Sequence, residues 1–153
     1  MSAPDTRLTQ DDILSAVEGL VSAESDMIAN MANIAAVLFE ALPRINWAGF
    51  YLLREGELVL GPFQGRVACT RIALGRGVCG KAASERSIQR IDDVHSFPGH
   101  IACDAASASE IVLPLVRNGE LLGVLDIDSP EQARFGDAEQ AVLERVVTLL
   151  LDA

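Results

Sequence analysis

Residues 111–129 read IVLPLVRNGELLGVLDIDS and contain two apolar segments separated by a short polar turn. Asn118-Gly119 is a strong signal for a two-residue hairpin, because both positions of that turn need a positive φ, which Asn and Gly tolerate best. We therefore predict that segments 111–116 and 121–127 form antiparallel strands joined at this turn.

Further strand patterns lie before this hairpin in the chain. Residues 46–53, NWAGFYLL, are rich in aromatic and aliphatic side chains and continue through a turn at 54–57 into a second expected strand at 58–61. A short strand is also expected at 87–91. These segments predict strand meanders in the middle of the chain.

Helix patterns occur at both ends of the chain. Thr9 is the predicted cap of a first helix, a second helix is expected from about Glu24 to Pro43, and Asp137 is the predicted cap of a last helix. Helices at both ends with strand meanders between them indicate an α+β fold, in which helices cover one face of an antiparallel sheet. The other face and its loops are then free to build a site.

The length and composition are those of one ordinary domain. A chain of 153 residues, half of them hydrophobic, can bury a core without needing disulfides or a metal to hold it together. Residues 1–153 are therefore expected to form a single domain, with residues 1–8 as a flexible N-terminal tail.

The charge and the cysteine count exclude several partners and compartments. A formal net charge of −10 argues against nucleic acid and anionic membranes, and no apolar run approaches the roughly 18 residues needed to span a bilayer. The N-terminus has no apolar segment behind a basic start, and three cysteines is an odd number. These features predict a cytoplasmic protein whose thiols are made in a reducing environment.

Residues 61–104 contain both histidines and all three cysteines, Cys69, Cys79 and Cys103. A single free cysteine is usually a small buried hydrophobe, but three in one polar, glycine-rich segment indicate reactive sulfurs. The run 75–83, GRGVCGKAA, is expected to open a helix and to place Cys79 near unpaired N–H groups that favour a thiolate. The loop that carries Cys103 is long enough to predict a functional role.

Trp47, Gly49 and Tyr51 alternate along the expected strand at 46–53, so they share one face of it. A glycine between two large rings would suit the wall of a small pocket. Core packing explains either ring, taken singly, at least as well.

Asp126 and Asp128 lie one strand period apart at the end of an apolar strand, so they face the same way. Such a pair needs a cation, an ammonium group or a proton to offset its repulsion, which indicates a site; alternatively, the strand has simply reached solvent. Glu110 enters the opposite strand. A regular hairpin sets it across from Ile127, on the other face, so Glu110 joins the aspartates only if a bulge or bend intervenes.

The cysteines and histidines allow two further interpretations. A zinc site has enough ligand types, yet the chain lacks Cys-x-x-Cys and paired-His spacings, so neither a metal nor a cofactor is predicted. A dyad of Cys103 with His95 or His100 would be of the cysteine-protease kind, but nothing in the sequence supplies an oxyanion hole.

Taken together, these motifs resemble the free methionine-(R)-sulfoxide reductases, enzymes built on a single GAF domain. The resemblance covers residues 46–136 and is carried most specifically by NWAGFYL (46–52), GVCG (77–80), FPGHIACD (97–104) and GVLDIDS (123–129). It implies a GAF fold and a thiol-dependent reduction of free L-methionine-(R)-S-oxide to L-methionine.

The resemblance also implies a role for each cysteine. Cys103 corresponds to the nucleophile that becomes a sulfenic acid, and Cys69 to the cysteine that resolves it as an intramolecular disulfide. Cys79 corresponds to an auxiliary or alternative resolving cysteine. Thioredoxin is the implied reductant of the disulfide.

The remaining candidates are implied to form the substrate site, with Glu110, Asp126 and Asp128 as substrate-holding carboxylates and Trp47 and Tyr51 as pocket walls. The resemblance also allows a homodimer, since GAF domains often pair through their terminal helices. A non-catalytic GAF sensor, which binds a small ligand or reports redox state, is the alternative function.

Overall fold

The computed structural model describes residues 9–100 and 106–153. Its elements in chain order are α1 (Gln10–Ala23), α2 (Met27–Ala41), β1 (Trp47–Arg54), β2 (Glu57–Gly65), β3 (Arg71–Ala73), α3 (Gly77–Glu85), β4 (Gln89–Ile91), the 3₁₀ turn η1 (Val94–Ser96), β5 (Ser109–Arg117), β6 (Glu120–Ser129) and α4 (Asp137–Leu151). The strands form one sheet in the order β3-β2-β1-β6-β5-β4, and neighbouring strands are antiparallel.

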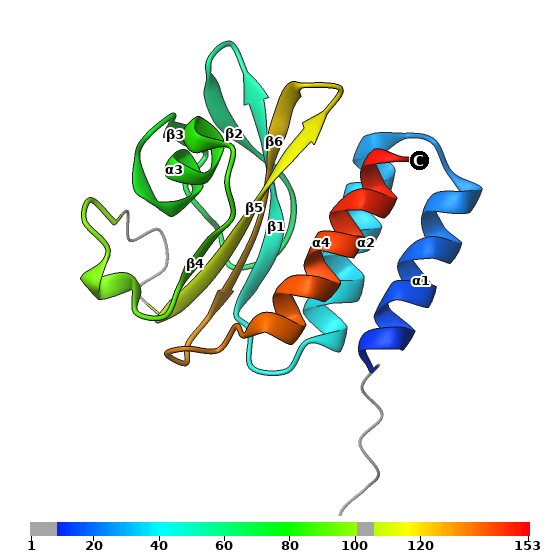
Figure 1. Ribbon diagram of the computed structural model, residues 1–153, viewed down its shortest axis with the longest axis horizontal. Coiled ribbons are helices and arrows are strands. Elements are labelled where there is room, and N and C mark those ends of the chain that lie inside the picture. The colour runs from blue at the N-terminus through cyan, green and yellow to red at the C-terminus, as the bar shows by residue number, and fades with distance from the viewer. Residues whose placement is uncertain (1–8, 101–105) are drawn as a thin grey trace, which may run out of the picture.

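The sheet separates two layers of helix (Figure 1). Helices α1, α2 and α4 lie together on one face, whereas the shorter α3 lies on the other. The predicted α+β architecture with helices on one face of an antiparallel sheet is confirmed, and the structure adds α3 to the face that was expected to carry loops alone. This second face is where the candidate site lies.

The first helix begins as predicted, but the other two terminal helices begin at different residues. Thr9 and Asp12 form the expected capping box of α1. The predicted start near Glu24 is wrong: Asp26 caps α2, because the Glu24 carboxylate accepts the N–H groups of Ser25 and Asp26 and holds this turn outside the helix. Asp137 is the first residue of α4, and Gly136 occupies the cap position.

The predicted hairpin is present as β5 and β6, with Asn118 and Gly119 at φ 53° and 78°. It is not regular along its whole length. Val116 pairs with Leu121, but Leu115 pairs with Gly123, so that Leu122 is an extra residue in β6. Beyond this bulge every partner is displaced by one position, and the residue across from Glu110 is Asp128 rather than Ile127.

The bulge decides which face each residue of β6 occupies. Leu125 and Ile127 belong to the core between the sheet and helices α1, α2 and α4. Val124 belongs to a second apolar cluster under α3, and Asp126 lies on that same side. Apolar clusters therefore pack against both sides of the strands that carry the carboxylates.

Replacement of Gly123 by Ala is expected to lower the free energy of unfolding by about 3 kcal/mol, at the upper end of overpacking costs. A Cβ at this position would lie 2.1 Å from the backbone oxygen of Tyr51, and a backbone atom in a central strand cannot move aside easily. Urea unfolding measures the change. Gly19→Ala is the matched control: its Cβ meets nothing within 4 Å in α1, so it should stabilise by about 0.5–1 kcal/mol. Equal effects of the two substitutions would contradict the bulge packing.

Candidate functional site

One wall of the site is a stack of aromatic rings. Trp47 and Tyr51 project from the same face of β1, as predicted, with ring centroids 5.9 Å apart, and Phe63 of β2 stacks on Trp47 at 5.2 Å. Gly49 makes this close packing possible, because a Cβ there would lie 2.3 Å from the Phe63 Cβ and 2.8 Å from the Trp47 ring. Phe63 was not predicted as part of this wall.

The polar ends of the two larger rings anchor the loop between β2 and β3. The Trp47 indole N–H donates to the carbonyl oxygen of Arg66 at 3.1 Å, and the Tyr51 hydroxyl donates to that of Cys69 at 2.8 Å. Cys69 is disulfide-bonded, whereas Cys79 is a free thiol. Cys103 lies outside the described residues.

The three candidate carboxylates lie together. Because of the β6 bulge, Glu110 faces Asp128 across the hairpin, and Asp126 lies one strand period away on the same side. Glu110 is only 7% exposed and Asp126 only 5%, while Asp128 is half-buried. Asp126 therefore does not lie at a solvated strand end, which was the alternative interpretation of this pair.

Cys79 completes this cluster from the opposite side. It occupies the third position of α3, and its Sγ lies 3.9 Å from Oε2 of Glu110. Burial and the neighbouring Asp126 and Glu110 raise the pKa of the Cys79 thiol well above its usual value. The expected thiolate at the start of α3 is therefore wrong: desolvation and nearby carboxylates outweigh the N–H groups of a nine-residue helix.

Burial also keeps the carboxyl groups from ionising together. It raises the pKa of Glu110 well above its usual value, with the negative charge of Asp126 as the next cause. The pKa of Asp126 is raised by burial and then by the charge of Asp128. Such a group of acids holds protons near neutral pH, attracts a cation, and includes candidates for proton donation.

These side chains line one pocket with about 550 Å³ of atom-free space, its open mouth included. The pocket brings together the predicted residues Trp47, Tyr51, Cys79, Glu110, Asp126 and Asp128. Its lining also contains Arg76 and Ser107, which were not predicted as site residues, and His100, which was considered only as a dyad partner of Cys103.

His100, named above as a possible dyad partner of Cys103, lies in a turn and contacts the pocket. Its backbone N–H donates to the carbonyl oxygen of Phe97 at 3.2 Å, and it lines the pocket. Burial, and next the charge of His95, lower the pKa of the His100 imidazole. The position of His100 three residues before Cys103 was the signal that could have marked it as a pocket residue.

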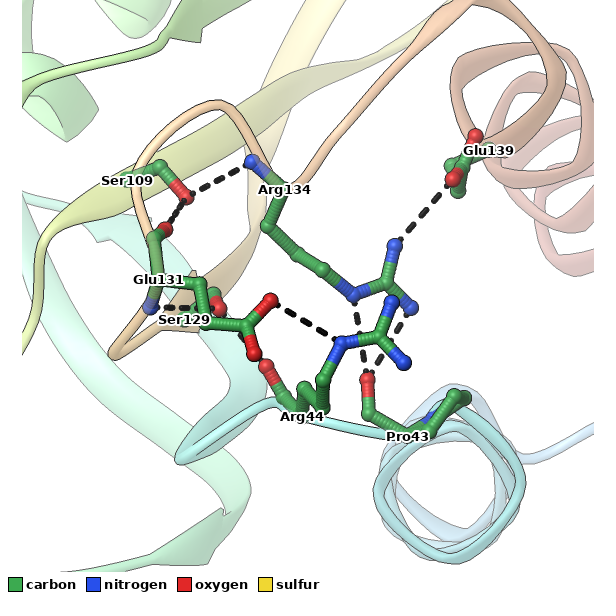
Figure 2. Close-up of polar contacts among 7 residues, drawn as sticks. All are labelled: Pro43, Arg44, Ser109, Ser129, Glu131, Arg134 and Glu139. Carbon is green, nitrogen blue, oxygen red and sulfur yellow. Dashed lines mark hydrogen bonds and ion pairs between the residues drawn. The ribbon is translucent and has the colours of Figure 1, made fainter.

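The strand ends beside the carboxylates are fixed by a hydrogen-bonded network around Ser109, Ser129 and Arg134 (Figure 2). The Ser129 hydroxyl donates to the carbonyl oxygen of Arg44 at 2.6 Å, and the Ser109 hydroxyl donates to that of Glu131. The buried Arg134 guanidinium donates to the carbonyl oxygen of Pro43 at 3.0 and 3.1 Å. These bonds attach the residues next to Glu110 and Asp128 to the end of α2.

The pH dependence of stability should reveal the buried carboxyls. A carboxyl whose pKa is raised on folding binds more protons when folded, so its contribution to stability is full below the unfolded pKa near 4 and is lost as pH rises towards the folded pKa. As pH rises, the free energy of unfolding of Asp126→Asn should fall less steeply than that of the parent. The two slopes should differ by up to about 1.4 kcal/mol per pH unit, the value for one proton. Urea unfolding between pH 5 and 8 measures both slopes. Parallel curves would show that Asp126 ionises freely in the folded protein.

Within residues 9–100 and 106–153, no helix combines the length and the apolar character needed to cross a membrane.

Comparison with known proteins yields consistent matches. The GAF domain family matches residues 29–153. The free methionine-R-sulfoxide reductase of Escherichia coli is 56% identical over 86% of this chain and 79% of that protein, and the Saccharomyces cerevisiae protein of the same name is 41% identical over 92% and 82%. The X-ray structure of free methionine-R-sulfoxide reductase from Neisseria meningitidis in complex with its substrate is 44% identical, covers 99% of this chain and 92% of that one, and has a TM-score of 0.91.

Proposed function

The chain belongs to the GAF domain family, and on this premise we propose that it reduces free L-methionine-(R)-S-oxide to L-methionine in the pocket between β1, β6 and α3. The observation that carries the proposal is the buried carboxylate cluster beside an aromatic wall. Relatives named free methionine-R-sulfoxide reductase support it, and so does a fold matched to a structure of that enzyme with its substrate.

A free amino acid has the groups that this pocket can recognise. Its α-ammonium group can donate charge-assisted hydrogen bonds to Glu110, Asp126 and Asp128, and it replaces the protons that otherwise offset their repulsion. The rings of Trp47 and Tyr51 can cover the apolar part of the side chain. A methionine sulfoxide within a peptide has an amide in place of the ammonium, so it could not form the charge-assisted hydrogen bonds with this cluster.

The proposed reaction uses two cysteines in sequence. The Cys103 thiolate attacks the sulfoxide sulfur, the oxygen is protonated and passes to Cys103, and methionine leaves with Cys103 as a sulfenic acid. The Cys69 thiol then displaces water from that sulfenic acid and forms a disulfide. An external dithiol, for which we propose thioredoxin in the cytoplasm, reduces this disulfide and restores both thiols.

The states of the other two cysteines support this assignment of roles. Cys69 forms a disulfide in the structure, and the Tyr51 hydroxyl holds its backbone beside the pocket. Cys79 is free and buried, with a pKa well above its usual value, which makes it a poor nucleophile at neutral pH. We therefore assign Cys69 to resolution and leave Cys79 an auxiliary role beside the carboxylates.

A carboxylic acid of the cluster is the proposed proton donor to the sulfoxide oxygen. Glu110 and Asp126 both keep a proton more readily than an exposed carboxyl, because burial and mutual repulsion raise their pKa. A donor with a pKa near the working pH is the most effective general acid. Binding of the ammonium and donation of the proton are thus two uses of one group of acids.

A turnover assay tests the proposed function. The purified protein is incubated with the R and S epimers of free methionine sulfoxide and excess dithiothreitol, and methionine is quantified. We expect methionine from the R epimer at a rate proportional to protein concentration. Saturable binding of the sulfoxide without methionine would favour the alternative of a GAF sensor, and the reductase proposal would then be wrong.

Cys69→Ser is expected to perform one turnover and to stop being recycled by thioredoxin, because the first step needs only Cys103. The measurement is the amount of methionine formed per protein, before and after addition of thioredoxin and its reductase. About one equivalent is expected in the burst. A variant that cycles with thioredoxin at the parent's rate would transfer the resolving role to Cys79.

A further inference from the structure

Three side chains from three different elements meet at the inner end of the pocket. A sulfur of Cys79 in α3, an oxygen of Glu110 in β5 and an oxygen of Asp126 in β6 all lie within 4.8 Å of one another, and all three residues are buried. A thiol and two carboxyls are each potential metal ligands. Their sequence positions are 31 and 16 residues apart, which is why no metal-binding spacing is visible in the sequence.

A second observation concerns Asp126. Its Oδ1 is buried and has no hydrogen-bond partner in the part of the chain that the structure describes, although the residue lines the pocket and is only 5% exposed. Buried carboxylate oxygens are normally hydrogen-bonded or bound to a cation, because desolvation without a partner is costly. This oxygen is therefore able to bind a cation.

We propose that Cys79, Glu110 and Asp126 form a binding site for a divalent cation of the zinc class. The ligand atoms need to approach only modestly, since a tetrahedral zinc ion holds sulfur and oxygen ligands roughly 3.3 to 3.8 Å apart. Sγ of Cys79 and Oε2 of Glu110 are already 3.9 Å apart.

The donor set selects among metals. A thiolate ligand favours zinc and softer cations over magnesium or calcium, which prefer shells made only of oxygen. Three protein ligands leave one tetrahedral position for Asp128 or a small molecule in the same pocket. The cation would thus lie within the pocket that a small molecule would occupy.

If the proposed function holds, this cation site overlaps the substrate site. The two carboxylates that would bind the cation are those assigned to the substrate's ammonium group, so the cation and the free amino acid must exclude one another. Zinc-class ions are therefore expected to be reversible competitors of methionine sulfoxide, without involvement of Cys69 or Cys103.

The test uses the full chain with Cys69→Ser and Cys103→Ser, which leaves Cys79 as its only thiol. Cobalt(II) is titrated while the sulfur-to-cobalt charge-transfer absorption is recorded, and Zn²⁺ affinity is measured by calorimetry and by displacement of cobalt. We expect one equivalent of cobalt to produce the band, and Zn²⁺ to abolish it. The band should be lost when Cys79→Ser is added, and Zn²⁺ affinity should fall at least about tenfold with Asp126→Asn.

Asp152→Asn, at the exposed end of α4, is the matched control and should leave Zn²⁺ affinity unchanged. Circular dichroism verifies the fold of each variant. Absence of the charge-transfer band, or equal Zn²⁺ affinity in Asp126→Asn and Asp152→Asn, would overturn the metal site.

The competition is measured on the same double-serine protein. Free methionine-R-sulfoxide should weaken Zn²⁺ binding in proportion to its concentration. If the sulfoxide left the Zn²⁺ affinity unchanged, the proposed competition between the cation and the amino acid would be wrong. The two proposals can fail separately. If the wild-type protein reduces the sulfoxide but binds no zinc, the proposed function stands and the metal site is wrong. If it binds zinc but does not reduce the sulfoxide, the metal site stands and the proposed function is wrong.

Discussion

Cys103→Ser is expected to reduce the formation of methionine from free methionine-R-sulfoxide by at least about a thousandfold, to the rate of dithiothreitol alone. A serine hydroxyl cannot accept the sulfoxide oxygen as a sulfenic acid, so the covalent route is closed and only substrate binding remains. The measurement is methionine formed per minute with dithiothreitol in excess, which bypasses the need for thioredoxin.

Two controls separate loss of chemistry from loss of fold. The thermal unfolding midpoint of Cys103→Ser should equal the parent's within about 2 °C under reducing conditions, because the substitution exchanges a single sulfur atom for oxygen. Cys79→Ser should retain measurable turnover, since Cys79 is assigned neither the attack nor the resolution. Near-parental activity of Cys103→Ser together with an inactive Cys79→Ser would reverse the assignment of the nucleophile.

Asp126→Asn is expected to lower the specificity constant for free methionine-R-sulfoxide by about one to two decades. The substitution keeps the shape of the side chain but removes one charge-assisted hydrogen bond to the ammonium, which is worth roughly 1.5 to 3 kcal/mol in a secluded pocket. Its activity towards N-acetylated methionine sulfoxide should change much less, because that compound has no ammonium group. The variant should therefore discriminate less between the two compounds.

Asp152→Asn is the matched control for this experiment as well, since it makes the same chemical change at an exposed position. Its specificity constants should equal those of the parent. If Asp126→Asn lowered turnover of both compounds by the same factor, Asp126 would act on the reaction step and not on recognition of the ammonium.

Much of the fold follows from local sequence signals. The Asn118-Gly119 turn determines the hairpin, and the alternation of Trp47, Gly49 and Tyr51 places two rings on one face of β1. Such features depend on residues adjacent in the chain, for which turn geometry and strand period are reliable guides. The capping box at Thr9 is a feature of the same kind.

The position of Glu110 depends on an interaction that sequence periodicity does not contain. The Leu121-Leu122-Gly123 run is apolar whichever residue is the extra one, so the regular pairing with Ile127 was the natural expectation. A Cβ at Gly123, next to the extra residue Leu122, would lie 2.1 Å from the Tyr51 carbonyl oxygen, so the strand can pass β1 at this point only because Gly123 has no side chain. A glycine inside a strand was the available sign of this bulge.

The chemistry of Cys79 and the role of Arg134 could not be predicted either, because both depend on tertiary contacts. A helix N-terminus lowers the pKa of a thiol only when no larger effect opposes it, and here three carboxyls and full burial oppose it. Arg134 is buried by bonding to the carbonyl oxygen of Pro43, 91 residues away in the chain. Nothing in its sequence neighbourhood indicates this partner.

The central claim is that a buried carboxylate cluster makes this protein a reductase of the free amino acid. The most direct measurement is a competition in one tube, in which the wild-type protein is given equal concentrations of free and N-acetylated methionine-R-sulfoxide with dithiothreitol, and both products are quantified over time. We expect methionine to accumulate while N-acetylmethionine stays at background until the free compound is consumed. Equal rates of formation of the two products would contradict the claim.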